Sequence, residues 1–225
     1  MVTRIGVVLF PGTNCELDVM DAFERLGADA EILWHGDATT KGVDAVIVPG
    51  GFAPGDYLRT GAIAQFSPVM GAVREHAAAG GPVIGICNGF QVLCESGLLP
   101  GALQKNAGLR FICQTAALEI VSPRSALTNR ATAGQMLHIP INHFEGNYTC
   151  DADTLAALRA DERIVVRYVD NPNGSLDDIA GICNEGRNVV GLMPHPERAS
   201  ETILGSGDGV VMLESVLAAC QSATV

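Results

Sequence analysis

The stretch PVIGICNGFQVL, residues 82–93, places a cysteine where an apolar strand changes directly into a helix. Val83–Ile86 is an apolar run typical of a buried strand, and a second apolar segment follows the cysteine at once. Gly85 and Gly89 flank Cys87 at equal spacing. A strand that feeds straight into a helix needs a sharp turn with strained backbone angles, and flanking residues without a Cβ make room for it. The sequence therefore predicts a Cys87 sulfur at the exposed edge of a sheet, beside a helix amino terminus that favours thiolate.

Outward from this turn, strands and helices alternate through the first half of the chain. The predicted strands are residues 4–10, 30–34, 45–48 and 83–86. The predicted helices are a first one capped by Thr13 or Asn14 and ending near Gly27, then 62–79 and 88–95, with a structured loop at 49–61. This alternation predicts an α/β domain with a doubly wound, mostly parallel sheet and helices on both faces. Sites in such sheets form where the strands end, so we expect the loops FPGTN, VPGGF and GICNG to share one edge.

The second half of the chain has a different pattern, with short strands and few helices. The predicted strands are residues 110–113, 118–121, 137–142, 164–168, 179–183 and 189–193, and the predicted helices are 151–160 and 208–220. We interpret these strands as antiparallel additions to the parallel core. Because no repeat or linker divides the sequence, we expect a single domain over residues 1–225.

Composition excludes several classes of function. The formal net charge of −11 repels phosphate backbones, which argues against nucleic-acid binding. No apolar run approaches the roughly 18 residues that a membrane span requires. The 7 cysteines are odd in number and irregularly spaced, which argues against a disulfide framework or a metal site and favours a reducing cytoplasm.

A nucleophilic cysteine needs a base, and His195 is the best candidate. It follows the last predicted strand in the sequence GLMPHPER, where Pro194 and Pro196 restrict the backbone on both sides. Glu197, two residues later, can place its carboxylate beside the imidazole and fix one tautomer. This spacing predicts a triad of Cys87, His195 and Glu197.

A second histidine and glutamate have the same spacing. His143 and Glu145 lie in INHFEGNY, and the sequence alone leaves this rival pair open as the base and its partner.

The triad also needs two N–H donors for an oxyanion. The backbone N–H of Asn88 opens the helix after the cysteine, and Gly51 lies in the PGGF turn after the neighbouring strand. We expect these two N–H groups to face the same point.

Several of these motifs resemble those of a known family. The segments VPGGF (48–52), GICNGFQ (85–91) and MPHPE (193–197) resemble class I, triad-type glutamine amidotransferases. The resemblance is closer to the glutaminase subunits of phosphoribosylformylglycinamidine synthase, an enzyme of purine biosynthesis, and covers nearly the whole chain. It rests on FPGTNCE (10–16), PGGFAPGDYLRTGAIA (49–64), LRFIC (109–113) and NPNGSLDDIAGICNEGRNVVGLMPHPER (171–198).

The resemblance implies a flavodoxin-like fold and a role for each site residue. Those roles are nucleophile for Cys87, proton shuttle for His195, orienting carboxylate for Glu197, oxyanion donors for Gly51 and Asn88, and pocket wall for Gln91. Glutamine would be hydrolysed to glutamate and ammonia through a glutamyl thioester. The loop at 142–146 departs from the family pattern, in which a smaller residue is expected at Asn142 or Phe144.

The resemblance also implies partners. Ammonia would pass to a larger synthase subunit that uses ATP and Mg²⁺, in a complex with a third, small bridging protein. This sequence contains no G-x-x-x-x-G-K-[ST] loop, so we expect no cofactor on this chain.

Three other interpretations remain open. Cysteine hydrolases and peptidases can carry a similar elbow, but they usually lack the His-x-Glu pair after a late strand. An amidotransferase of pyridoxal phosphate or histidine synthesis would share the triad but not PNGSLDDIAGI (172–182) or GDYLRTGAIA (55–64). A silent binding subunit would not need all three triad residues.

Overall fold

One large sheet organises the computed structural model, which describes residues 2–53, 55 and 59–222. Within these residues the strand order is β2-β1-β3-β4-β11-β10-β9-β6-β7. In chain order the strands are β1 (Arg4–Leu9), β2 (Asp29–Trp34), β3 (Ala45–Val48), β4 (Val83–Ile86), β6 (Ile112–Ile120), β7 (Met136–His143), β9 (Ile164–Tyr168), β10 (Ile179–Cys183) and β11 (Val189–Leu192). The strands from β2 to β11 in this order are parallel, and those from β11 to β7 are antiparallel. The predicted fold class is confirmed.

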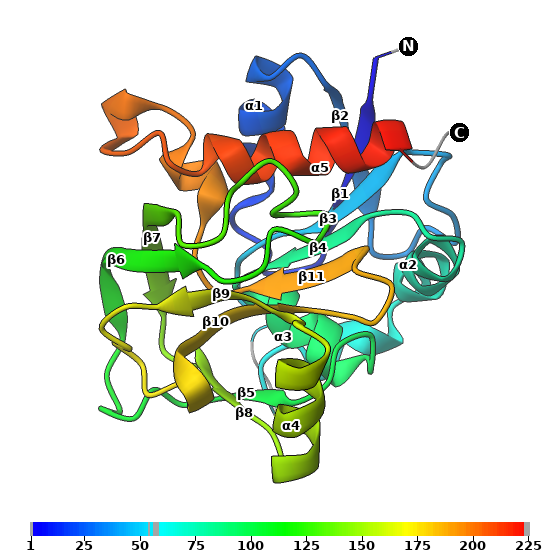
Figure 1. The fold of residues 1–225 in the computed structure, drawn as a ribbon. Coiled ribbons are helices and arrows are strands. Elements are labelled where there is room, and N and C mark those ends of the chain that lie inside the picture. The colour runs from blue at the N-terminus through cyan, green and yellow to red at the C-terminus, as the bar shows by residue number, and fades with distance from the viewer. Residues whose placement is uncertain (1, 54, 56–58, 223–225) are drawn as a thin grey trace.

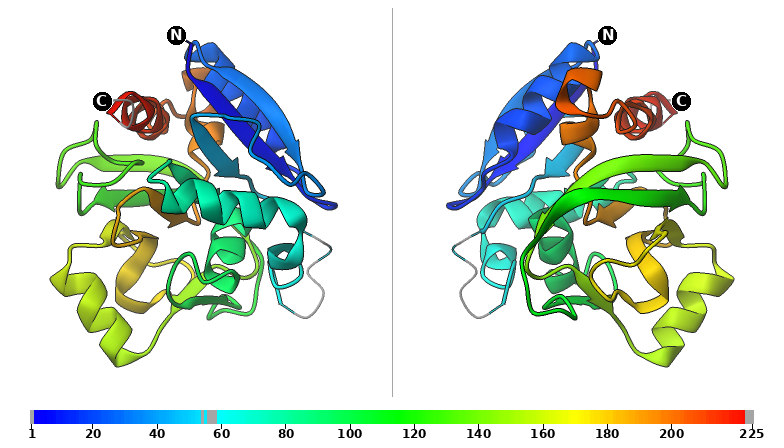
Figure 2. Two further views of the ribbon diagram at one scale, coloured as in Figure 1. Left: turned by 90° about the vertical axis from the view of Figure 1, so that its right-hand side faces the viewer. Right: turned by 90° about the vertical axis from the view of Figure 1, so that its left-hand side faces the viewer.

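Helices cover both faces of the parallel half (Figures 1 and 2). They are α1 (Glu16–Arg25), α2 (Pro68–Ala78), α3 (Asn88–Glu95) and α5 (Val210–Ser222). The crossover from β1 to β2 runs in the opposite direction along the sheet from the crossover from β3 to β4. Since such crossovers are right-handed, α1 and α2 lie on opposite faces. In Figure 1, α1 and α5 lie above the sheet and α3 lies below it.

The central strands are buried on both faces, which explains their continuous apolar sequences. Every residue of β3 and β4 is buried. A parallel strand covered by helices on both sides gains from an apolar side chain at each position, so no alternation is seen. Because β1, β3, β4 and β11 are parallel, their carboxyl ends meet along one edge of the sheet, as expected.

A smaller layer lies beside the antiparallel half. Strands β5 (Ala102–Gln104) and β8 (Asn147–Thr149) form a two-stranded sheet, and α4 (Ala152–Ala160) follows β8. Figure 2 shows α4 on the same side of the molecule as this small sheet, away from α5. Asp151 caps α4 by accepting a hydrogen bond of 2.7 Å from the backbone N–H of Thr154.

Three sequence predictions of element bounds were wrong. The first helix begins at Glu16 with Cys15 before it, because the Thr13 hydroxyl accepts a hydrogen bond from the Phe10 N–H instead of capping the helix. The helix predicted over 62–79 begins at Pro68, where a proline suits the first turn. The two strands predicted over 110–113 and 118–121 are the single strand β6, which continues through exposed residues while it pairs with β7.

Two further points concern the loop and the surface. Within the loop predicted at 49–61, positions 54 and 56–58 lie outside the described residues.

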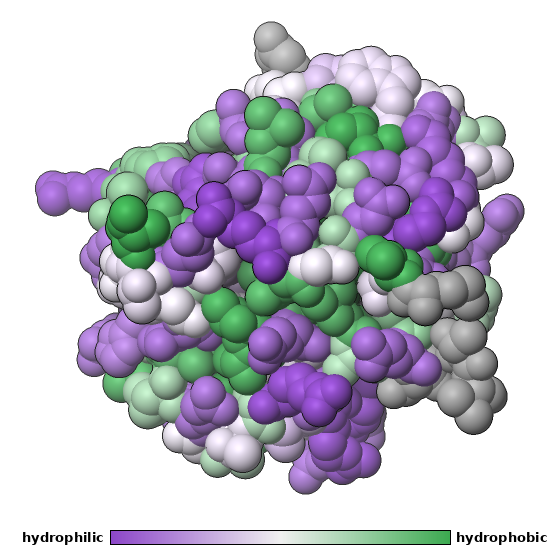
Figure 3. Space-filling view, turned by 90° about the horizontal axis from the view of Figure 1, so that it is seen from above, coloured by the Kyte–Doolittle hydropathy of each residue, from purple (hydrophilic) through white to green (hydrophobic). Residues whose placement is uncertain are grey.

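Seen from above, hydrophilic side chains on the surface are interspersed with hydrophobic patches (Figure 3). None of the helices in the described ranges has both the length and the apolar character that crossing a membrane demands.

Candidate active site

The turn between β4 and α3 has the strained geometry that the sequence predicts. Cys87 lies at its apex with φ 51° and ψ −105°, a positive φ that is rare outside glycine. A Cβ on Gly89 would lie 1.8 Å from the carbonyl oxygen of Val48, and one on Gly85 would lie 2.6 Å from Cδ1 of Leu93. Both flanking glycines are therefore required by close approach, and the turn holds the cysteine at the start of α3.

The sulfur of Cys87 lies at the wall of a cavity of about 210 Å³. Its side chain is nearly buried, with 5% of the residue exposed, and Sγ lies 3.8 Å from the carbonyl oxygen of Asn142. The sequence predicted a sulfur at an exposed edge, but the loop that follows β7 covers that edge. The cavity is also lined by Gly51, Gln91 and His143. The thiol thus faces a cavity that is large enough for an amino acid.

His195 and Glu197 form a buried pair at the end of β11. Nδ1 of His195 lies 2.6 Å from Oε1 of Glu197, and 1% and 2% of these residues are exposed. Pro196 opens the short helix Pro196–Ala199, which brings the carboxylate back beside the imidazole. The backbone N–H of His195 donates to the carbonyl of Pro140 at 2.9 Å and fixes the turn against β7.

The electrostatic setting of His195 favours the imidazolium. Burial alone would lower its pKa, but the Glu197 carboxylate and then the nearby Cys87 thiol outweigh burial and hold the pKa well above its ordinary value. A histidine whose pKa is raised in this way takes a proton readily from a neighbouring thiol.

The rival pair of His143 and Glu145 is not formed. Nδ1 of His143 lies 3.1 Å from Oδ1 of Asn106, and within the described chain no hydrogen bond joins His143 to Glu145. Burial, followed by the charge of His195, lowers the pKa of His143 to about 4. His143 lines the same cavity as Cys87, but no carboxylate of the described residues is bound to its ring to stabilise a charge.

The loop after β3 presents the Gly51 N–H to the cavity. The carbonyl oxygen of Gly50 accepts hydrogen bonds from the backbone N–H groups of Asn14 and Cys15, both at 3.2 Å. In a trans peptide the N–H of the next residue points the opposite way from that carbonyl. The Gly51 N–H therefore points away from the loop at 13–15, and Gly51 lines the cavity.

Gln91 is part of the cavity wall and also connects two loops. Its Nε2 donates to the carbonyl of Glu145 at 2.5 Å, and its Oε1 accepts from Nδ2 of Asn88 at 2.8 Å. Since both ends of the amide are engaged, Gln91 holds the loop after β7 against the first turn of α3.

Cys15 is a site residue that the sequence analysis did not identify. Its sulfur accepts a hydrogen bond of 3.2 Å from Nη2 of Arg198, whose Nε donates to Asp18 at 3.0 Å. The ligand-type atoms of Cys15, His195 and Glu197 all lie within 4.8 Å of one another. Such a group could hold a cation, but the short hydrogen bond already engages Oε1 of Glu197 with the imidazole. The sequence feature that could have identified Cys15 is its position in FPGTNCE, after the first strand.

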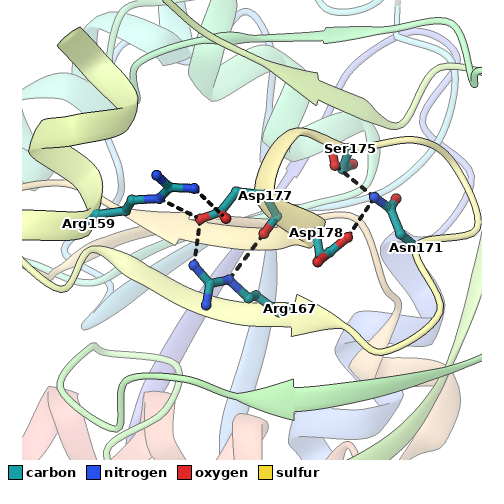
Figure 4. A network of polar contacts seen from close by, with 6 residues as sticks. All are labelled: Arg159, Arg167, Asn171, Ser175, Asp177 and Asp178. Atoms are coloured by element: carbon teal, nitrogen blue, oxygen red, sulfur yellow. Dashed lines mark hydrogen bonds and ion pairs between the residues drawn. The ribbon is translucent and has the colours of Figure 1, made fainter. Parts of the chain in front are cut away.

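A polar network supports the far wall of the site (Figure 4). The carboxylate of Asp177 binds the guanidinium groups of Arg159 and Arg167, both of which point to it from neighbouring elements. The loop that Asp177 closes contains Asn173, whose Nδ2 donates to the carbonyl of Gly146 at 2.8 Å. Residues 171–178 therefore brace the loop whose Glu145 carbonyl binds Gln91.

Comparison with known proteins identifies relatives over almost the whole chain. Residues 2–207 match the family described as the CobB/CobQ-like glutamine amidotransferase domain. The chain is 58% identical to the phosphoribosylformylglycinamidine synthase subunit PurQ of Rubrobacter xylanophilus, over 96% of this chain and 98% of that protein. It is 53% identical to the PurQ subunit of Alkaliphilus metalliredigens, over 95% of each chain. A chain in the structure of PurLQS from Thermotoga maritima superposes with a TM-score of 0.90 at 39% identity, covering 97% of this chain and 99% of that one.

Proposed function

Because this chain belongs to the CobB/CobQ-like glutamine amidotransferases, and among them to the PurQ subunits of phosphoribosylformylglycinamidine synthase, we propose that Cys87 is the nucleophile of its glutaminase reaction. The chain is the glutaminase subunit of that synthase and acts in purine biosynthesis. One observation supports the assignment of the nucleophile above the others. Cys87 is the cysteine on the strained turn beside the cavity, and it lies close enough to His195, whose Nδ1 is bound to Glu197, to raise the pKa of that imidazole.

In the first half-reaction the thiol proton of Cys87 moves to His195, and the sulfur attacks the side-chain amide carbon of glutamine. The amide oxygen becomes an oxyanion and accepts hydrogen bonds from the backbone N–H groups of Gly51 and Asn88. His195 then gives its proton to the amide nitrogen, the C–N bond breaks, and ammonia leaves a glutamyl thioester on Cys87. Glu197 keeps the imidazole in one tautomer and stabilises its charged form.

In the second half-reaction water replaces ammonia at the same place. His195 takes a proton from the water, the resulting oxygen attacks the thioester carbonyl, and the same two N–H groups stabilise the second oxyanion. The C–S bond breaks, the sulfur recovers its proton from His195, and glutamate leaves. No redox step or cofactor is needed on this chain, so we propose that ATP and Mg²⁺ belong to the partner subunit.

The partners follow from the relatives. The solved structure of PurLQS contains the relative of this chain together with PurL and PurS. By analogy, this chain binds a larger synthase subunit that consumes the ammonia and a small bridging subunit. We propose a cytoplasmic location, because the 7 cysteines are odd in number and irregularly spaced, a pattern that favours a reducing compartment.

The test separates ammonia production from ammonia use. Glutamate release is measured with the chain alone and with the synthase partners, ATP and formylglycinamide ribonucleotide. Cys87→Ala should abolish glutamine-dependent synthesis and leave synthesis from added ammonia intact. Loss of both activities would show that Cys87 is needed for assembly of the complex. Modification of Cys94 or Cys113 by iodoacetamide, with Cys87 unmodified, would contradict the assignment of Cys87 as the nucleophile.

A further inference from the structure

His143 lines the cavity that contains Cys87, and its ring carries a buried nitrogen without a hydrogen-bond partner among the described residues. The residue is 4% exposed, and within the described residues its Nε2 has no hydrogen-bond partner. Buried polar atoms of folded proteins are nearly always paired, so an unpaired one on a residue that lines a cavity is a candidate to bind a group that enters it. The glutaminase steps above do not use this nitrogen.

The hydrogen bonds of Asn106 fix the tautomer of His143. Nδ2 of Asn106 donates to the carbonyls of Arg110 and His143, each at 2.9 Å, which assigns Oδ1 as the acceptor end of the amide. That oxygen accepts from the Gly146 N–H at 3.2 Å and faces Nδ1 of His143 at 3.1 Å. Nδ1 must therefore carry the proton. In the neutral ring Nε2 is then a hydrogen-bond acceptor.

The ring is also held in place and kept neutral. A Cβ on Gly146 would lie 2.3 Å from Cε1 of His143, so the backbone of residue 146 packs directly on the imidazole. Burial first, and the charge of His195 second, oppose protonation, and the pKa of His143 is lowered to about 4. The acceptor at Nε2 therefore persists at neutral pH.

We propose that Nε2 of His143 accepts a hydrogen bond from a nitrogen of bound glutamine. The donor is the α-ammonium or the side-chain amide, and both present an N–H that glutamine brings into the cavity. This inference rests on the proposed function, because it assigns a substrate contact in the same site. It also gives the cavity a fixed acceptor that complements a nitrogen donor and rejects a carboxylate oxygen in the same place.

The experiment replaces the acceptor and keeps the shape of the ring. In the assembled complex, His143→Phe should raise the KM for glutamine about tenfold to a hundredfold, the scale of one lost hydrogen bond in a buried site. Asn106 retains the Gly146 N–H as a donor, so the change leaves no acceptor unpaired. His138→Phe is the matched control: the same substitution on the same strand at an exposed position, where KM should not change.

A second substrate identifies the donor. The analogue 5-amino-5-oxopentanoate lacks the α-amino group of glutamine. If the α-ammonium is the donor, the ratio of kcat/KM between the wild type and His143→Phe should fall to near one with the analogue. If the side-chain amide is the donor, the ratio should persist.

Folding and chemistry are checked independently. The rate of Cys87 alkylation by iodoacetamide in the absence of glutamine should match the wild type, and His143→Gln, whose amide oxygen can accept, should recover part of the affinity. An unchanged KM in His143→Phe, with the wild-type complex active, would overturn this inference and leave the glutaminase assignment intact. A wild-type complex that releases no glutamate would instead overturn the proposed function.

Discussion

The side-chain oxygen of Asn88 accepts a hydrogen bond of 3.0 Å from the backbone N–H of Ala53. This bond joins the first residue of α3 to the loop that contains Gly51, across a separation of 35 residues. The two backbone N–H groups proposed to bind the oxyanion belong to Gly51 and Asn88. The Asn88 side chain therefore fixes the distance between them, and the fold sets up the pair before substrate arrives.

Asn88→Ala should lower kcat for glutamine hydrolysis about tenfold to a hundredfold, because small displacements of catalytic groups have effects of that size. Asn88→Asp keeps the acceptor for Ala53 and removes only the N–H donor to Oε1 of Gln91, so it should lose less. The measurement is glutamate release by the complex, with iodoacetamide labelling of Cys87 as the control for an intact turn. Equal losses in the two variants would assign the effect to the lost bond with Gln91 and would show that the bond to Ala53 has no part in catalysis.

Glu197→Gln should reduce kcat by roughly 10²–10⁴ while the KM for glutamine changes little, because the carboxylate acts on His195 and not on the substrate. Steady-state kinetics of the complex over a range of glutamine concentrations separates the two parameters. Glu201→Gln, a nearby carboxylate that pairs with Arg25 on the surface, is the control and should be neutral. A wild-type kcat in Glu197→Gln would remove Glu197 from the mechanism.

The core of the fold and the central turn could be predicted because local sequence determines them. Apolar runs and the glycines around Cys87 specify β3, β4 and α3 almost to the residue. The contacts that build the site are long-range, and no local pattern reports them. Cys15 lies beside His195 only because the first and last parallel strands end at the same edge.

The choice between the two histidines shows the same limit. His143 and Glu145 have the spacing of His195 and Glu197, and only the fold distinguishes the pairs. Asn106, 37 residues away from His143, binds the ring of His143, whereas Glu197 binds His195, two residues before it.

The small strands β5 and β8 are three residues each, too short for a periodic pattern.

Gly50→Ala should disable the site without affecting the fold elsewhere. A Cβ at this position would lie 2.7 Å from Cε1 of His195 and 3.0 Å from Sγ of Cys15, so the imidazole must move. We expect glutaminase activity to fall at least tenfold, since the histidine must lie within hydrogen-bonding reach of the thiol. The same substitution at Gly71, in α2, meets no atom within 4 Å and should keep full activity and gain slightly in stability. Full activity in Gly50→Ala would mean that the ring position is not critical.

The lowered pKa of His143 predicts a pH dependence of stability. An unfolded histidine titrates near 6.5, and the folded one at about 4. Between these values the unfolded chain binds a proton that the folded chain does not, so stability falls as the pH is lowered through this window. The full effect is on the order of 3 kcal/mol in the free energy of unfolding.

Urea unfolding at pH 7 and pH 5 measures this effect, with His143→Phe as the comparison. The wild type should lose about 2 kcal/mol more than the variant between these two values. Equal losses would show that His143 is protonated in the folded chain and would also weaken its assignment as an acceptor.

Asp177 should stabilise the loop that supports the cavity wall. Its carboxylate lies between two guanidinium groups, its side chain is 17% exposed, and its pKa is lowered, chiefly by the hydrogen bond from Arg159. Asp177→Asn keeps a residue that tolerates the positive φ of 56° and removes only the charge. We expect the free energy of unfolding to fall by about 1–2 kcal/mol.

Asp178→Asn is the matched control for this change. Asp178 is the next residue, has a similar φ of 55° and is exposed, so its amide should change stability by less than about 0.5 kcal/mol. Urea unfolding at pH 7 compares the two variants. If they lose stability equally, the ion pairs with Arg159 and Arg167 do not determine the strength of the loop. If only Asp177→Asn loses stability, the ion pairs with Arg159 and Arg167 hold the segment that braces Gly146.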